Sequence, residues 1–98
     1  MGISNLVLDQ LLRFDQELEV IVDYIALDSP ARALDFFETI ISKVQKIPEN
    51  PYIYRQKSCA NDDKTRELIF KGYTIPFDID EANNKIIILG IFNQNIWN

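Results

Sequence analysis

The chain is short and acidic, and its composition limits what it can do. It has 98 residues, 47% of them hydrophobic, so we expect a single domain over residues 1–98 with a core of its own. Fifteen acidic residues against ten basic ones give a net charge of -5, which opposes non-specific attraction to nucleic acid or to an anionic membrane surface.

A short strand followed by an amphipathic helix is predicted at the start of the chain. The apolar run Leu6-Val7-Leu8 is typical of a strand. From Leu11 onward, apolar residues recur at helical spacing, with acidic residues on the opposite side. The apolar positions are Leu11, Phe14, Leu18, Ile21, Val22 and Ile25. This pattern predicts a helix that packs one face against a core.

A second helix is predicted directly after the first. Ser29 is a suitable N-cap, and Pro30 takes the first helical position, where its missing N–H costs nothing. The helix is expected to stop before Pro48. Its buried side is predicted to consist of Ala33, Phe36 or Phe37, Ile40, Ile41, Val44 and Ile47. Because the link is so short, the two helices should form an antiparallel hairpin.

Three antiparallel strands are predicted in the second half of the chain. Residues 66–71 and 73–80 alternate, and Gly72 between them suits a turn or a bulge. Residues 85–92 are apolar on both faces, as in a central strand covered by helices. Pro76 cannot donate to a ladder, so it is expected at an edge or an irregularity. The predicted fold class is α+β: an N-terminal strand, a two-helix antiparallel hairpin and a three-stranded antiparallel sheet.

The residue types leave little room for a catalytic centre. The chain has no histidine, so the usual general base at neutral pH is absent and a Ser-His or Cys-His nucleophile is excluded. Cys59 is the single cysteine and has no partner for a disulfide and no imidazole to join it at zinc. The three glycines are far apart, which excludes a glycine-rich phosphate loop. We therefore expect no cofactor and no metal.

Two groups of polar residues remain as candidates. Asp78 and Asp80 share a strand face and could bind a hard cation, but acids that lead into a polar turn are usually solvated. Arg66, Lys71 and Tyr73 are the candidates for catalysis on RNA, since cations stabilise phosphate charge and a lysine or tyrosine can move protons. The alternative is structural, with Tyr73 packed in a sheet face and Arg66 paired with an acid.

Trp97 lies close to the chain end, where a tryptophan is not readily explained by a core. It is expected to dock either onto its own domain or onto a partner. The N-terminus has no basic segment followed by an apolar run, and no stretch approaches the roughly 20 apolar residues that a membrane helix needs. We expect a soluble, cytoplasmic protein with no membrane partner.

The order of these elements resembles the RelE/ParE superfamily, the toxins of type II toxin–antitoxin pairs, which act in plasmid stabilisation. The similarity extends over almost the whole chain and depends on the joint order of several short segments. These are Asp23-Tyr24-Ile25-Ala26, Asp28-Ser29-Pro30 with Ala33 beyond it, the stop at residues 47–51, Arg66-Glu67-Leu68, Gly72-Tyr73-Thr74-Ile75 and the final Ile88-Leu89-Gly90-Ile91-Phe92.

Within this superfamily the resemblance favours the ParE-like branch. RelE-like members cleave mRNA on the ribosome with basic residues on the sheet, typically an arginine after the Gly-Tyr pair and two lysines on the preceding strand. Those places hold Thr74, and Thr65 with Glu67. ParE-like members, which poison DNA gyrase, show an Arg-Glu-Leu strand and a polar stretch before a tryptophan. Residues 66–68 and 93–97 look similar, although relatives often have histidine where Asn93 stands.

The resemblance thus implies a growth-inhibiting toxin that binds a protein target such as DNA gyrase, with Arg66, Tyr73, Asn93 and Trp97 as target-binding residues. It also implies a cognate antitoxin that wraps an amphipathic segment over the helices or the sheet. A homo-oligomer and a toxin–antitoxin hetero-oligomer are both compatible with it. Two alternatives stay open: a ribosome-dependent mRNA endoribonuclease, and a non-toxic member that acts as an interaction module.

Overall fold

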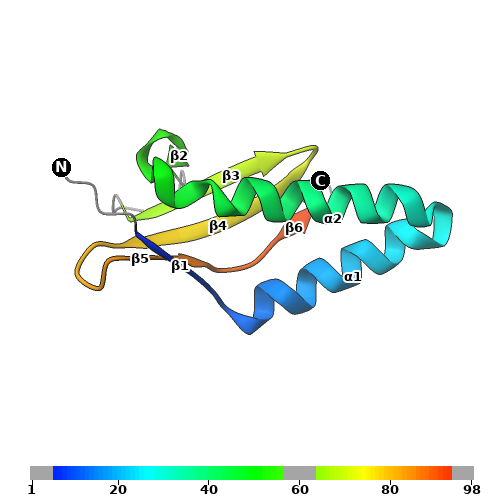
Figure 1. The fold of residues 1–98 in the computed structure, drawn as a ribbon, viewed down its shortest axis with the longest axis horizontal. Helices are drawn as coiled ribbons and strands as arrows, with labels where there is room; N and C mark the ends of the chain where they lie inside the picture. The colour runs from blue at the N-terminus through cyan, green and yellow to red at the C-terminus, as the bar shows by residue number, and fades with distance from the viewer. Residues whose placement is uncertain (1–5, 57–63, 94–98) are drawn as a thin grey trace.

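Helices α1 and α2 cover one face of a β-sheet in the computed structural model of the chain, and their hairpin extends past the end of the strands (Figure 1). The structure describes residues 6–56 and 64–93. The elements are β1 (Val7–Gln10), α1 (Leu12–Asp28), α2 (Pro30–Gln45), the 3-10 turns η1 (Ile47–Glu49) and η2 (Pro51–Ile53), β2 (Arg55–Gln56), β3 (Thr65–Phe70), β4 (Tyr73–Asp80), β5 (Lys85–Ile88) and β6 (Phe92–Asn93). The predicted α+β architecture is confirmed.

The two helices begin and pack largely as their sequence predicts. The Ser29 hydroxyl oxygen accepts a hydrogen bond from the Arg32 backbone N–H at 3.2 Å, and Pro30 stands at the first helical position. Of the two adjacent phenylalanines, Phe36 is buried and Phe37 is exposed. Ile47 is buried as expected, although it lies in η1 because α2 ends at Gln45.

The sheet contains more pairings than the three predicted antiparallel strands. Among the described residues its order is β1-β5-β4-β3-β2, and β6 also pairs with β4. β4 is antiparallel to both of its neighbours β3 and β5, as predicted, whereas β1 runs parallel to β5 with Leu8 opposite Ile86. β5 is therefore an interior strand. Its buried side and that of β4 meet the helices in a core that comprises Phe14, Leu18, Phe36, Ile40, Val44, Ile47, Leu68, Ile75, Phe77, Ile79, Ile86, Ile88 and Ile91.

The final apolar run is interrupted, which corrects the prediction of one continuous strand over residues 85–92. β5 ends at Ile88 and β6 starts at Phe92, so residues 89–91 leave the ladder. Pro76 lies opposite this interruption, and its carbonyl oxygen accepts from the Leu89 N–H at 2.9 Å. A strand residue points its N–H and C=O to the same side, so the N–H that proline lacks would face the break. The predicted irregularity at Pro76 is confirmed, within an interior strand.

A carboxylate from α1 binds the backbone at this break. Glu17 Oε1 accepts from the Ile91 N–H at 3.0 Å, and its Oε2 accepts from Arg13 Nε at 2.9 Å. A Cβ added at Gly90 would lie 2.5 Å from Glu17 Oε1, so a larger residue here would push the carboxylate away from its present place. The Glu17 carboxylate thus replaces the ladder bond that the Ile91 amide has lost.

Lys71 lies in a tight turn and not on β3, where the alternating pattern had placed it. β3 and β4 are joined by Lys71-Gly72, and Phe70 pairs with Tyr73 across the turn. The φ angles of these two turn residues are 51° and 84°, as in the two-residue hairpin turns that favour Asn-Gly. Because a left-handed backbone is unfavourable for a residue with a Cβ, Lys71 carries local strain.

We expect Gly90→Ala to lower the free energy of unfolding by about 1–3 kcal/mol, because the new methyl group displaces the Glu17 carboxylate and leaves the Ile91 amide without an acceptor. Urea denaturation measures the change. In a Glu17→Ala background the clash is absent, so Gly90→Ala should cost less than about 0.5 kcal/mol there. Equal costs in the two backgrounds would show that the Glu17 contact is not what requires glycine.

Replacing Lys71 with asparagine should stabilise the protein by about 0.5–1 kcal/mol, because asparagine tolerates a left-handed backbone better than lysine does. Lys71→Ala is the matched control, since it removes the same side chain and keeps the unfavourable Cβ without asparagine's local hydrogen bonding. Thermal unfolding of both variants separates the effect of the turn from that of the charge. A gain as large in the alanine variant would contradict the strained-turn interpretation.

Candidate functional site

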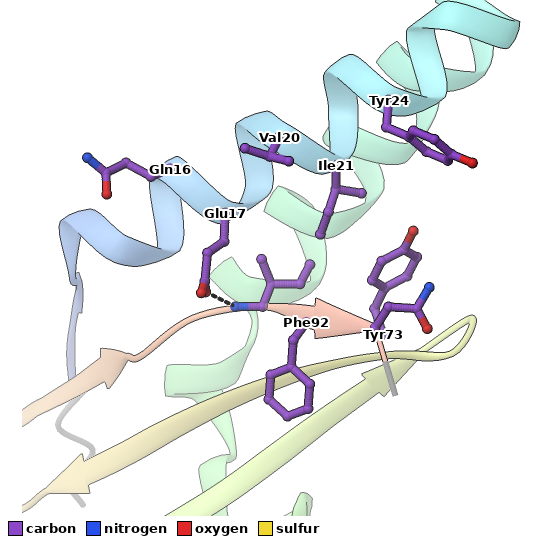
Figure 2. Close-up of a pocket in the computed structure, with 9 residues that line it drawn as sticks. Gln16, Glu17, Val20, Ile21, Tyr24, Tyr73 and Phe92 are labelled. Carbon is purple, nitrogen blue, oxygen red and sulfur yellow. Dashed lines mark hydrogen bonds between the residues drawn. The ribbon is translucent and has the colours of Figure 1, made fainter. Parts of the chain in front are cut away.

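An apolar groove runs between α1 and the short strand β6, with a volume of about 630 Å³. Figure 2 shows side chains of α1 above it and the strands below it. We call it the α1–β6 groove and define it by its lining residues, which are Gln16, Glu17, Val20, Ile21, Tyr24, Tyr73, Ile91, Phe92 and Asn93. It is an open, largely apolar hollow, which is the form that a peptide-binding surface takes.

The break in the last strand creates this groove. Because residues 89–91 leave the ladder and Glu17 holds the Ile91 amide, the chain passes beneath α1 before it rejoins β4 as β6. Ile21 and Glu17 point from α1 toward the strand, whereas the ring of Phe92 points away from the helix (Figure 2). Val20 and Tyr24 are exposed at the upper rim of the groove.

Two of the predicted target-binding residues meet in the groove. Tyr73 and Asn93 are cross-strand partners in the β4–β6 pair, and both are half-buried. The Tyr73 ring packs against Phe36 of α2 with 5.2 Å between ring centroids, which helps to fix its position. Tyr73 therefore presents the polar end of an otherwise packed ring, next to an amide side chain. That these two residues bind a target remains a prediction.

Arg66 lies elsewhere. It pairs with Phe77, four residues along β4 from Tyr73, so it does not line the α1–β6 groove. Its guanidinium lies 5.3 Å from the centroid of the Tyr52 ring, and Nη1 donates to the carbonyl oxygens of Tyr52 at 3.4 Å and Tyr54 at 3.2 Å. These contacts hold the η2 segment against the sheet. Trp97, the fourth predicted residue, lies outside the described residues.

Lys71 and Tyr73 border a second, smaller hollow. It has a volume of about 250 Å³ and lies between the helical hairpin and the β3–β4 turn, where Arg32 and Asp35 also line it. The exposed Lys71 ammonium is 5.4 Å from the Phe70 ring centroid, and Lys43 Nζ approaches the same ring at 5.1 Å. Tyr73 thus contributes to both hollows. The candidate catalytic trio is not assembled, because Arg66 is absent from both.

In this chain, none of the three residues at the positions where RNA-cutting relatives have basic side chains is basic. Thr74 is fully buried, and its hydroxyl oxygen has no hydrogen-bond partner within residues 6–56 and 64–93. Glu67 is buried too and faces Arg55, with 3.5 Å between Oε1 and Nε. Thr65 donates its hydroxyl to Asp78 at 2.9 Å. These side chains contribute no free cation to this face of the sheet.

The acidic residues Asp80 and Glu81 near the β4–β5 turn accept hydrogen bonds from other residues of the chain. Asp80 accepts from the backbone N–H and the side-chain amide of Asn83, and these bonds hold the pKa of Asp80 below its usual range. Glu81 accepts from the Tyr52 hydroxyl. Within the part of the chain that the structure describes, no group of three or more histidine, cysteine or acidic residues could hold a metal ion.

The α1 wall of the groove is what reasoning from the sequence missed. Val20, Tyr24 and Leu27 recur at helical spacing and form an apolar line away from the buried residues Phe14 and Leu18, and the first two line the groove. That spacing was visible in the sequence, but the stronger core pattern of the same helix concealed it. The other wall depends on the interrupted strand, and Gly90 inside the final apolar run is the local signal that could have indicated it.

Comparisons with known proteins give a consistent result. A family model described as the ParE toxin of the type II toxin–antitoxin system parDE matches residues 10–96. A search of curated proteins gives no match. Among solved structures, the chromosomal ParDE TA system from P. aeruginosa is similar with a TM-score of 0.74 and 21% identity, over 91% of this chain and 96% of that chain. At this identity the likeness shows a shared fold. Among the described residues, no helix is long and apolar enough to span a membrane.

Arg66→Ala should lower the free energy of unfolding by about 1–2 kcal/mol, because two carbonyl groups lose a charged donor and Tyr52 loses a cation over its ring. Arg32→Ala is the matched control, since its exposed pair with Asp28 should be worth less than about 0.5 kcal/mol. Urea denaturation of both variants makes the comparison. A change at Arg66 no larger than at Arg32 would refute a structural role for Arg66.

Proposed function

This chain belongs to the ParE toxin family of type II toxin–antitoxin systems, and from that premise we propose that it arrests growth by binding a protein target such as DNA gyrase. In this proposal Tyr73 and Asn93 form the centre of the target-binding surface, with Arg66 and Trp97 as further contributors. The protein acts by occupying a surface of its target, and it requires no cofactor.

One observation carries the preference for binding over RNA cleavage. Where an RNA-cutting relative places cations, this chain has the buried Thr74 and the buried Glu67 with its partner Arg55. Cleavage of RNA requires groups that stabilise phosphate charge and move protons within reach of the substrate. A buried hydroxyl and a buried carboxylate do neither, whereas the accessible α1–β6 groove offers a largely apolar surface with a few polar groups, as protein-binding sites do.

A cognate antitoxin is part of the same proposal. The solved structure with the same fold is described as a ParDE TA system, and a toxin of this kind requires neutralisation in the cell that makes it. We propose that the antitoxin binds this chain directly and covers the residues that engage the target.

The endoribonuclease remains the second candidate, and a specific observation supports it. Lys71 is exposed two residues from Tyr73, and both Lys71 and Lys43 approach the Phe70 ring. These lysines could bind RNA phosphates beside a tyrosine that stacks on a base. Arg66 is too far along the sheet to join them, so any such activity would depend on Lys71 and Tyr73.

Induced expression without an antitoxin should stop growth, and purified protein should inhibit supercoiling by DNA gyrase. Tyr73→Ala combined with Asn93→Ala should raise the concentration for half-maximal inhibition about tenfold or more, which corresponds to about 1.4 kcal/mol of binding energy. Leu34→Ala, an exposed position on α2 outside the groove, should leave inhibition unchanged. Circular dichroism confirms that each variant is folded.

The opposite outcome is equally specific. If the protein leaves gyrase active but cuts mRNA on intact ribosomes, and Lys71→Ala abolishes the cutting, then the endoribonuclease replaces the proposed function. Normal growth on induced expression, with folded protein present, would instead identify a non-toxic interaction module.

A further inference from the structure

The face of the sheet that points away from the helices is less exposed than an uncovered face should be. We call it the outer face, since both helices lie on the opposite side of the sheet (Figure 1). Among the described residues, the buried polar side chains are Glu67 and Thr74, which are 8% and 0% exposed. Both alternate with core residues along their strands, β3 and β4, and so point to the outer face. Polar side chains on an open sheet face would be solvated, so their burial indicates a cover.

Thr74 lies between two larger apolar side chains on the outer face. The strand register places it opposite Ile69 of β3 and opposite Phe92 of β6. Residues directly opposite one another share a face of the sheet, and the Phe92 ring points away from α1 (Figure 2). Ile69 and Phe92 are each 38% exposed. These three residues form what we call the outer row, which extends over two strand spacings, about 10 Å, and has accessible apolar ends.

The chain continues from one end of this row. β6 ends at Asn93, one residue after Phe92, and the sequence then reads Gln94-Asn95-Ile96-Trp97. Four extended residues span up to about 14 Å, whereas neighbouring strands lie about 5 Å apart. The side chain of Trp97 can therefore reach every part of the outer row.

We propose that residues 94–97 turn back over the outer face and that the Trp97 indole packs across Thr74, between Ile69 and Phe92. Asparagine at positions 93 and 95 favours such a turn, because its side chain bonds to the nearby backbone and tolerates a left-handed conformation. An indole is a large, flat apolar group. It covers the small central side chain of the row and buries the apolar side chains at its two ends.

This contact anchors β6 from its far end. β6 has two residues, and the bond between Glu17 and the Ile91 amide holds the chain only before it. Packing of Trp97 on the outer row holds the chain after it, and so keeps Asn93 beside Tyr73. Trp97 is then a positioning residue for Asn93 in target binding. That consequence rests on the proposed function, whereas the docking itself does not.

Tryptophan fluorescence tests the docking directly, because Trp97 is the only tryptophan in the chain. We expect the folded protein to emit at shorter wavelength than protein unfolded in urea, and acrylamide to quench it at least about threefold less effectively. Emission and quenching equal to those of the unfolded protein would overturn the docking.

A pair of matched substitutions tests the location. Ile69→Ala should about double the quenching constant of the folded protein, because it removes one side of the contact. Val20→Ala is the control, since Val20 is an exposed apolar residue of the α1–β6 groove, on the helix side of the sheet, and should leave quenching unchanged. Circular dichroism confirms that both variants are folded. A change at Val20 as large as that at Ile69, or no change at either, would overturn the outer row as the site.

Hydrogen exchange tests the anchor. Trp97→Ala should speed amide exchange in residues 89–93 about tenfold or more and leave the β3–β4 pairs, such as Leu68 with Ile75, unchanged. Trp97→Phe should restore most of the protection, because a phenyl ring can cover the same row. Exchange in residues 89–93 that stays the same after Trp97→Ala would overturn the anchoring role.

None of these measurements involves a target, so the two proposals can fail separately. If Trp97 is protected on the outer row but the folded protein neither stops growth nor inhibits gyrase, the proposed function fails and the docking stands. If the protein inhibits gyrase while Trp97 is quenched as in the unfolded chain, the docking alone fails.

Discussion

The hydrogen bond from the Ile91 amide to the Glu17 carboxylate connects the two layers of this protein at the place where its last strand breaks. A backbone N–H that leaves a ladder needs another acceptor, since an unpaired one costs about as much as a lost hydrogen bond. α1 supplies that acceptor, and Gly90 provides the space that lets the carboxylate approach. Together with the burial of the Ile91 side chain in the core, this bond holds the chain under α1 between β5 and β6 and so supports one wall of the groove.

Two surfaces bear on the choice between RNA cleavage and protein binding: the α1–β6 groove, and the face of the sheet that points away from the helices. On that face, buried Thr74 and the Glu67–Arg55 pair occupy positions that RNA chemistry would need for cations. On the groove side, Tyr73 and Asn93 are accessible within a mostly apolar surface. An acidic chain that carries its accessible apolar surface on an acidic helix is better suited to binding proteins than to binding nucleic acid. This contrast supports the proposed role in recognition over one in cleavage.

Local patterns in the sequence predicted the elements but not all of their partners. The cap at Ser29, the buried face of α2 and the alternation of β4 depend on neighbouring residues, so they could be read directly. Leu89 and Ile91 continue the apolar run, so the predicted strand passed through them, although Gly90 between them is a local sign of an irregularity. The alternation of apolar and polar residues continues through Lys71 and so predicts a strand there, but its backbone forms the β3–β4 turn. The parallel pairing of β1 with β5 joins residues almost eighty positions apart, beyond any local pattern.

The α+β class, the helical hairpin and the family resemblance could be predicted from the sequence, because hydrophobic periodicity, helix caps and short ordered segments are local properties. The sequence also determined which chemistry is missing, since no fold can supply a histidine that the chain lacks. The tertiary structure alone decided that Tyr73 and Asn93 meet while Arg66 lies apart, and that α1 and an interrupted strand form a groove. Those arrangements depend on strand register and on the bond between Glu17 and Ile91, which join segments that are distant in the chain.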